Sequence, residues 1–304
     1  VRIEQYEVDA VFNQGEETEN YRDEKITAYP SAFFTYSPSE KNQFQVSYSR
    51  RVDRPGIGQV NPIRSSWSSP LVIFVGNPEL RPQFTNSYEI NYSRRLKKGS
   101  VSLGTFYRRI NDNIIRYTNA DPFDVNKVEV TYTNAEGESR YGIEMSGMYR
   151  PTGWWNMNGS FDLYSQLMTG YAFGEFVEVS SVSTNVRLNN TFKVTKNLSF
   201  QLFGMYRGAR EVIQWTFKPM WMVNSGVSLK VFQQKGTLSL RVNDIFNTMR
   251  FRFESTNFYP STGGFSWESR TAYLGYAHNF GQGKFKARKR RQRDSNELSG
   301  SGGF

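Results

Sequence analysis

Residues 43–49 and 87–93, with the sequences QFQVSYS and SYEINYS, decide the fold class of this chain. In the first segment the apolar residues Phe44, Val46 and Tyr48 alternate with polar ones, and the second segment repeats the pattern. Successive side chains of a β-strand point to opposite faces, so each segment predicts a strand with one apolar and one polar face. The two segments therefore favour an all-β fold.

The same alternation continues along the chain and predicts about twelve strands. No segment has a sustained helical period, and the longest apolar run, Leu71 to Val75, is far shorter than the ~20 residues of a membrane-spanning helix. The phase is ambiguous in 27–37, where Phe33 and Phe34 are adjacent. The predicted strands lie at 1–12, 27–37, 43–49, 87–93, 101–107, 141–145, 157–163, 182–192, 198–202, 223–231, 238–242 and 274–280.

The connections between these strands alternate in length. Short turns are predicted at 37–42, 95–99, 151–153, 195–197 and 233–236. Long loops are predicted at roughly 13–26, 51–82, 111–138, 168–180, 207–217 and 249–268. Outer-membrane barrels have short periplasmic turns and longer extracellular loops. We therefore expect an antiparallel transmembrane β-barrel over residues 1–281 and a periplasmic tail over 282–304.

Charged residues in the middle of the predicted strands favour a barrel over a soluble sandwich. A dry sandwich core would leave each of these charges unpaired at a cost of several kcal/mol, whereas a wet lumen removes that cost. A soluble β-protein is the alternative, but it would have to bury the apolar face of its sheet elsewhere. The predicted lumen-facing residues are Glu89, Glu144, Asp162, Arg187, Lys230 and Arg241.

The sequence contains few candidates for catalytic or metal-binding residues. The chain has no cysteine, and its single histidine, His278, lies on the predicted lipid-facing register without a catalytic partner. Asp112, Asp121, Asp124 and Asn126 could supply oxygen ligands to calcium, but the order of an EF-hand loop is missing, and solvated carboxylates are the simpler interpretation. We expect neither an enzyme nor a cofactor or metal site.

The net charge of +10 is concentrated near the end of the chain. No basic stripe follows the strands, so nucleic acid is not an expected partner. Phe280 is predicted to close the last strand, and a basic, then Gly- and Ser-rich, tail follows it. The tail is either solvated or in contact with anionic head groups or an acidic periplasmic partner. Its basic residues are Lys284, Lys286, Arg288, Lys289, Arg290, Arg291 and Arg293.

Four stretches resemble a known family. Residues 76–93, GNPELRPQFTNSYEINYS, resemble a segment found late in the barrels of TonB-dependent receptors. Residues 47–62, 243–252 and 279–293 resemble, more narrowly, the Bacteroidetes-type outer-membrane β-barrel branch of that superfamily. The resemblance implies a plugged barrel of ~22 strands in the bacterial outer membrane, of which this chain would be the C-terminal part. The plug and the energy-coupling box would then lie upstream.

The resemblance implies lipid, the upstream barrel with its plug, and a periplasmic energy-coupling protein or surface lipoprotein as partners. Two functions are open: uptake of an unidentified ligand, or a structural or scaffold role in a larger outer-membrane complex. The loop 51–82 has cationic and aromatic groups suited to a peptide, glycan or siderophore. The candidate ligand residues of this loop are Arg54, Arg64, Trp67 and Phe74.

Overall fold

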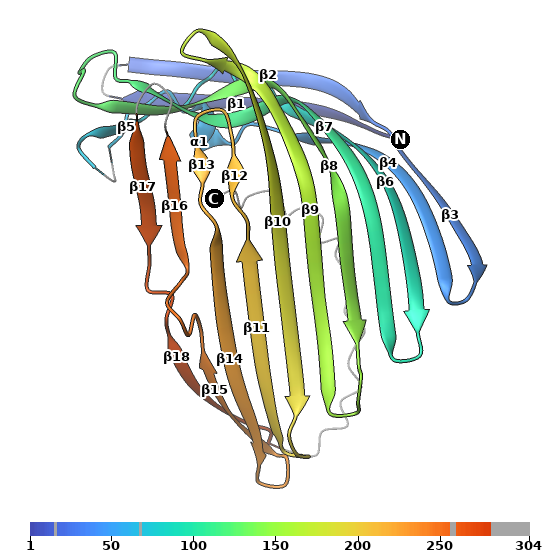
Figure 1. The fold of residues 1–304 in the computed structure, drawn as a ribbon. Helices are drawn as coiled ribbons and strands as arrows, with labels where there is room; N and C mark the ends of the chain where they lie inside the picture. The colour runs from blue at the N-terminus through green and yellow to red at the C-terminus, as the bar shows by residue number, and fades with distance from the viewer. Residues whose placement is uncertain (15–16, 67–68, 256–259, 281–304) are drawn as a thin grey trace.

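A computed structural model describes residues 1–14, 17–66, 69–255 and 260–280 (Figure 1). The predicted ligand residue Trp67 and the whole basic tail lie outside these residues. Antiparallel strands dominate the described chain, as the alternation predicts. Its helix, α1 (Ile57–Val60), is four residues long, and no helix in the described ranges is long and apolar enough to cross a membrane.

The main sheet is a curved wall of antiparallel strands in the order β18-β15-β14-β11-β10-β9-β8-β7-β6-β4-β3 (Figure 1). One further strand, β5 (Val72–Phe74), pairs in parallel with the start of β8. The strands are β3 (Ser31–Ser39), β4 (Asn42–Asp53), β6 (Gln83–Leu96), β7 (Gly99–Ala120), β8 (Val128–Tyr149), β9 (Trp155–Ala172), β10 (Glu175–Lys193), β11 (Leu198–Arg207), β14 (Met220–Val231), β15 (Gly236–Val242) and β18 (Ala272–His278).

Two smaller sheets accompany the wall. A hairpin forms from β1 (Arg2–Gln14) and β2 (Glu17–Tyr29). A four-stranded sheet contains β12 (Arg210–Glu211), β13 (Thr216–Phe217), β16 (Arg250–Ser255) and β17 (Ser261–Ser266), in that order. Its strands follow or precede β11, β14, β15 and β18 in the chain and keep the same spatial order, so this sheet prolongs the end of the wall.

The five predicted short turns are confirmed, and they lie along one edge of the wall, which we call the turn end (Figure 1). They occupy residues 40–41, 97–98, 150–154, 194–197 and 232–235. We call the opposite edge the loop end.

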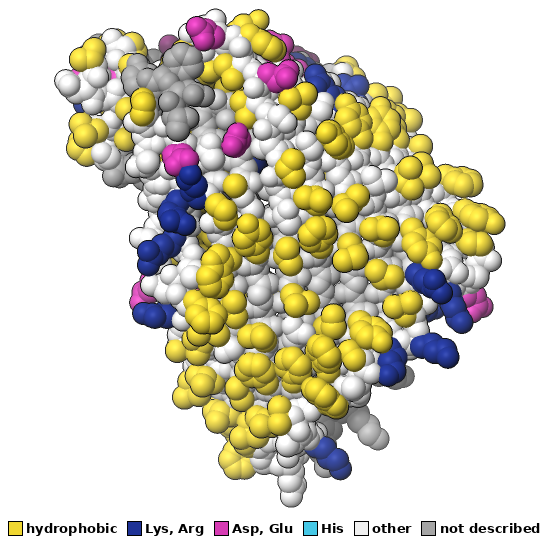
Figure 2. All heavy atoms as spheres, in the orientation of Figure 1, with side chains coloured by type: hydrophobic (Ala, Val, Ile, Leu, Met, Phe, Trp, Pro, Cys, Tyr) yellow, Lys and Arg dark blue, Asp and Glu magenta, His cyan; other side chains and the backbone are white. Residues whose placement is uncertain are grey.

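The strand register separates one apolar and one polar face of the wall. Paired residues of an antiparallel ladder lie on the same face. The apolar face carries such pairs as Leu103↔Met145, Phe192↔Phe200, Val227↔Leu240 and Leu240↔Leu274. Its side chains are open to the surroundings, with Leu274 exposed to 75%. Figure 2 shows apolar side chains spread over the visible surface of the sheet. An apolar surface of this extent requires lipid rather than water.

Several predicted long loops are strands instead. Residues 13–26 belong largely to the β1–β2 hairpin, β7 runs to Ala120, and β9 and β10 are joined by Phe173 and Gly174 alone. Both of these turn residues have positive φ, 54° and 84°, as a tight hairpin turn requires. The hairpins extend past the region where one face is apolar, so the alternation stops before the strands do.

Two other strand boundaries need correction. The predicted strand 27–37 is divided at Pro30, because proline cannot donate a ladder hydrogen bond; β2 ends before it and β3 begins after it. The last strand ends at His278, so Phe280 lies two residues beyond it, with 90% of its surface exposed. His278 pairs with Gly236 on the apolar face, as predicted.

Candidate functional site

The polar face of the wall brings together all six predicted lumen residues. The ladder links Glu144 to Asp162, and Arg187 occupies the same face through its pairing with Ser160. Glu89, Lys230 and Arg241 follow through the pairs Glu89↔Phe106, Lys230↔Thr237 and Gly226↔Arg241. Their common face is therefore a structural fact, while their role in lining a lumen remains a prediction.

Arg108, which was not among the predicted site residues, connects two of the acidic residues on this polar face. The Arg108 guanidinium on β7 lies 3.4 Å from the Glu89 carboxylate on β6 and 3.1 Å from the Glu144 carboxylate on β8. It also lies 4.0 Å from the centroid of the Phe106 ring. These side chains are 32% to 43% exposed, so the pairs are only moderately stabilising. Their main effect is to hold these three charged side chains in fixed positions on the neighbouring strands β6, β7 and β8.

Closer to the loop end the polar face is buried. The Glu138 side chain is fully buried between Arg140, its ion-pair partner, and Asn113, whose amide donates to Glu138 Oε2 over 2.7 Å. Gln166 is also fully buried, and its amide N–H donates to the backbone carbonyl of Glu211, although its Oε1 has no partner among the described residues. Buried polar groups need such partners, so this part of the polar face is a packed hydrogen-bonded layer.

The ligand loop was predicted over 51–82, but β4 continues to Asp53, so the loop begins at residue 54. Arginines fasten residues 54–82 to the rest of the loop end. Arg54 pairs with Glu4 at 2.9 Å, donates to the Tyr29 hydroxyl at 3.2 Å and lies over the ring of Tyr6. One predicted ligand residue thus holds the loop to the β1–β2 hairpin.

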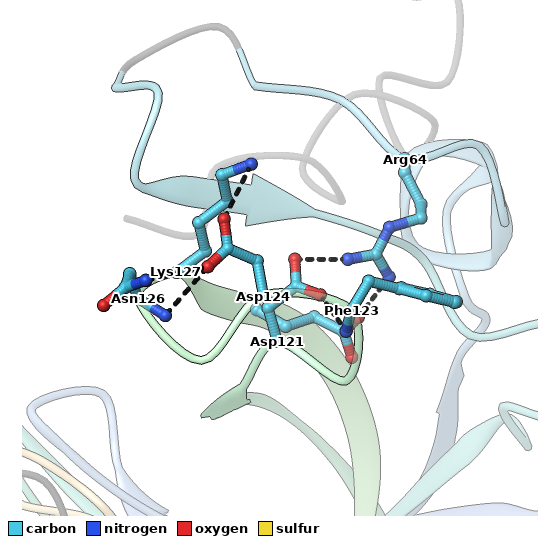
Figure 3. A network of polar contacts seen from close by, with 7 residues as sticks. Arg64, Asp121, Phe123, Asp124, Asn126 and Lys127 are labelled. Carbon is cyan, nitrogen blue, oxygen red and sulfur yellow. Dashed lines mark hydrogen bonds and ion pairs between the residues drawn. The ribbon is translucent and has the colours of Figure 1, made fainter.

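Arg64 makes the second attachment, to the tip of the β7–β8 hairpin (Figure 3). Its two terminal nitrogens lie 2.6 Å from Asp121 and 2.5 Å from Glu129, and its guanidinium stacks over Phe123. Asp121 is only 4% exposed, so its carboxylate is shielded from water, while about a third of the Arg64 side chain is exposed. Both predicted arginines are engaged within the chain, and direct contact of either with a ligand remains a prediction.

The third attachment involves residues 77–82, NPELRP, which are part of the stretch 76–93 that resembles TonB-dependent receptors. The Arg81 guanidinium donates twice to Asp112 Oδ1, at 2.9 and 2.6 Å. Asp112 has φ 53° and interrupts the regular pairing of β7 with β8. Asn77 donates to the carbonyl of Tyr132, and Leu80 is buried beside Val60. The segment therefore anchors the loop to the irregular part of this hairpin.

The residues considered for calcium are distributed among these attachments. Asp112 pairs with Arg81. Figure 3 shows the other two pairs, Asp121 with Arg64 and Asp124 with Lys127, the latter at 3.3 Å. Hydrogen bonds from the Asn126 backbone, and then from Lys127, hold the pKa of the Asp124 carboxyl below its ordinary value. In the described ranges no group of three or more His, Asp or Glu side chains is placed to hold a metal.

A pocket of about 530 Å³ lies at the start of β16 and the end of β17, where these strands connect to β15 and β18. Arg250, Arg252, Asn247 and Trp267 are among its lining residues. Within the described part of the chain no carboxylate forms an ion pair with either arginine. This pocket was not predicted, because 249–268 was predicted to be a long loop and not the strands β16 and β17. Phe74, the remaining predicted ligand residue, is half-buried in β5 and pairs through its backbone with Ser65.

A wide antiparallel sheet with one lipid-compatible face and one polar, ion-paired face defines the wall of a membrane β-barrel. The chain belongs to the outer membrane protein beta-barrel family, whose model matches residues 1–278. The family places the chain in the bacterial outer membrane. No curated protein matches the chain in sequence.

Solved structures of receptors and transporters share this fold. The siderophore receptor PirA from Pseudomonas aeruginosa has a TM-score of 0.56 and 13% identity, over 85% of this chain and 44% of that one. The FrpB iron transporter from Neisseria meningitidis has a TM-score of 0.52 and 15% identity, over 85% and 40%. PirA from Acinetobacter baumannii has a TM-score of 0.51 and 13% identity, over 84% and 42%. The chain thus spans less than half the length of these proteins.

Replacing Arg64 by lysine should loosen the ligand loop. Lysine keeps the charge but cannot bridge two carboxylates or stack flat on a ring, so a loss of about 1–3 kcal/mol at this attachment is expected. Hydrogen exchange of backbone amides in 61–66 and 69–75 should accelerate about tenfold or more. Arg51→Lys, an exposed change on β4, is the control. Equal exchange in the two variants would show that the Arg64 contacts do not hold the loop.

Proposed function

We propose that this chain forms the C-terminal part of the wall of a TonB-dependent uptake receptor of the Bacteroidetes type. The observation that carries the proposal is the polar face, which extends across the wall while the opposite face is apolar. In a closed barrel such a face surrounds a polar interior. The similarity in fold to receptors for siderophores supports the same function.

The remaining wall and a plug are the proposed intramolecular partners. Among the described strands, β3 and β18 each pair along one side only, and open strand edges in lipid cost several kcal/mol per unpaired backbone group. Upstream strands completing a barrel of ~22 strands would satisfy both edges. Asp162, Arg187 and Arg241 have no ion-pair partner within the described residues, so a polar plug is a suitable neighbour for them.

We further propose that the loop end faces the cell exterior and the turn end the periplasm, where an energy-coupling protein would act. The ligand class that we propose is anionic, because the pocket beside β16 and β17 presents Arg250 and Arg252 together with Trp267. The proposed role is binding and passage of that ligand, without a catalytic step.

The test compares cells that make the protein with otherwise identical cells that lack it. Both are grown in one complex medium, and the solutes remaining in the medium are measured by mass spectrometry. We expect selective depletion of at least one anionic solute by the producing cells, abolished when a protonophore removes the energy source. Identical media from both strains would contradict uptake and favour the scaffold role.

A further inference from the structure

Four aromatic rings form a continuous cluster on the apolar face at the turn end. Trp155, Phe192 and Phe200 come from the adjacent strands β9, β10 and β11 and are paired across the ladder. Their ring centroids are 5.9 and 6.1 Å apart in near-parallel stacks. Trp154, in the turn before β9, lies 6.2 Å from Phe192 and 6.3 Å from Trp155. The turn end therefore carries a rigid aromatic surface on its membrane side.

This surface forms one wall of a groove of about 590 Å³. The groove is lined by Trp154, Phe192, Lys193, Val194 and Phe200. Trp154 and Val194 are more than half exposed, so the groove opens outward from the apolar face. Its floor is apolar. Lys193 pairs with Ser199 on the polar-face register of β10, but as the last residue of that strand it lines the groove at the strand end and is the single charged residue among those that do.

The two tryptophans differ in their hydrogen bonding. The Trp155 indole N–H donates to the Asn190 side chain over 3.0 Å, and this contact satisfies a polar residue that is only 9% exposed. In the described part of the chain neither the Trp154 indole N–H nor the Lys193 ammonium has a side-chain acceptor. Two donors thus stand at the border of an apolar groove, one of them positively charged.

We propose that this groove binds a glycerophospholipid of the surrounding leaflet. One acyl chain lies along Phe192, Phe200 and Val194, and the phosphate accepts hydrogen bonds from Lys193 and Trp154. The position fits this ligand, because Trp collects at the membrane interface and a lysine near it attracts an anionic head group. A soluble anion would leave the apolar floor unused, and an uncharged lipid would leave Lys193 unpaired. The site is independent of ligand uptake through the barrel.

Native mass spectrometry of the protein purified from outer membranes tests the proposal. Delipidated protein is titrated with phosphatidylglycerol or with diacylglycerol of the same acyl chains, which lacks the phosphate. We expect one molecule of phosphatidylglycerol to bind per protein, with an affinity at least about tenfold higher than that of diacylglycerol. A charge-assisted hydrogen bond contributes enough binding free energy for this difference. Equal binding of the two lipids would overturn the phosphate assignment.

Matched variants separate the roles of the two donors. Lys193→Ala should weaken phosphatidylglycerol binding about tenfold, and Trp154→Phe, which keeps the ring and removes the N–H, should weaken it severalfold. Lys41→Ala, in the β3–β4 turn away from the groove, should leave binding unchanged. Unchanged binding in Lys193→Ala, or an equal loss in Lys41→Ala, would overturn the site in favour of unspecific lipid adhesion.

Discussion

Leu240→Arg is expected to destabilise the inserted barrel by about 2–4 kcal/mol, the largest effect of a single charge on a lipid-facing strand. Leu240 lies on the apolar face of β15, between Val227 and Leu274 on the neighbouring strands. An arginine there would have to enter hydrocarbon or distort its surroundings to reach water. The quantity to measure is the free energy of unfolding in lipid bilayers, by denaturant titration of tryptophan fluorescence.

The neighbouring residue supplies the control for this prediction. Arg241 lies on the polar face, one position along the same strand. Arg241→Leu should therefore leave the free energy of unfolding in bilayers nearly unchanged, although it removes a full charge. Similar losses in Leu240→Arg and Arg241→Leu would mean that the two faces have been assigned incorrectly.

Asp244→Ala should have a comparably large effect, for a different reason. Asp244 is fully buried in the segment that joins β15 to β16. Its carboxylate accepts hydrogen bonds from the backbone N–H groups of Thr248 and Met249, at 2.9 and 3.0 Å, and from the Ser269 hydroxyl at 2.6 Å. Removing it leaves these donors unsatisfied, at ~1–3 kcal/mol for each, so a total of about 3 kcal/mol or more is expected.

The backbone of Asp244 adds to this cost and suggests a milder variant. Its φ of 42° lies in the left-handed region, which Asp and Asn tolerate better than Ala. Asp244→Asn keeps an acceptor and this tolerance, and should lose clearly less stability than Asp244→Ala. Glu178→Ala, an exposed change on β10, is the control. If the denaturation midpoints of Asp244→Ala and Glu178→Ala coincide, the Asp244 contacts do not stabilise the segment.

The sequence predicted the wall and its two faces because each strand is apolar on one side within the membrane. Leu103 and Tyr107 on β7 already show the phase that the ladder confirms through Met145 and Tyr141. The same signal could not predict the continuation of β7 to Ala120. Both faces are half-buried or in contact with other loop-end segments there, so polar and apolar residues no longer alternate.

The candidate site was less predictable, because its contacts depend on the tertiary structure. The predicted loop 51–82 is rich in cationic and aromatic residues, but its sequence does not show that Arg64 contacts Asp121 and Glu129. A single sequence holds no local signal for a partner 57 or 65 residues away. Likewise, the segment NPELRP was recognised by resemblance alone, and its contact with Asp112 emerged only in three dimensions.

The arginine attachments have a consequence for the order in which the barrel assembles. Arg54 meets a residue made 50 positions earlier, whereas Arg64 and Arg81 need partners that lie 57 and 31 positions later. Closing such long intervals costs chain entropy before any contact repays it, which slows folding. The loop 54–82 therefore matures late, after β8 has joined the growing wall. Until then its backbone stays accessible to periplasmic proteases and chaperones.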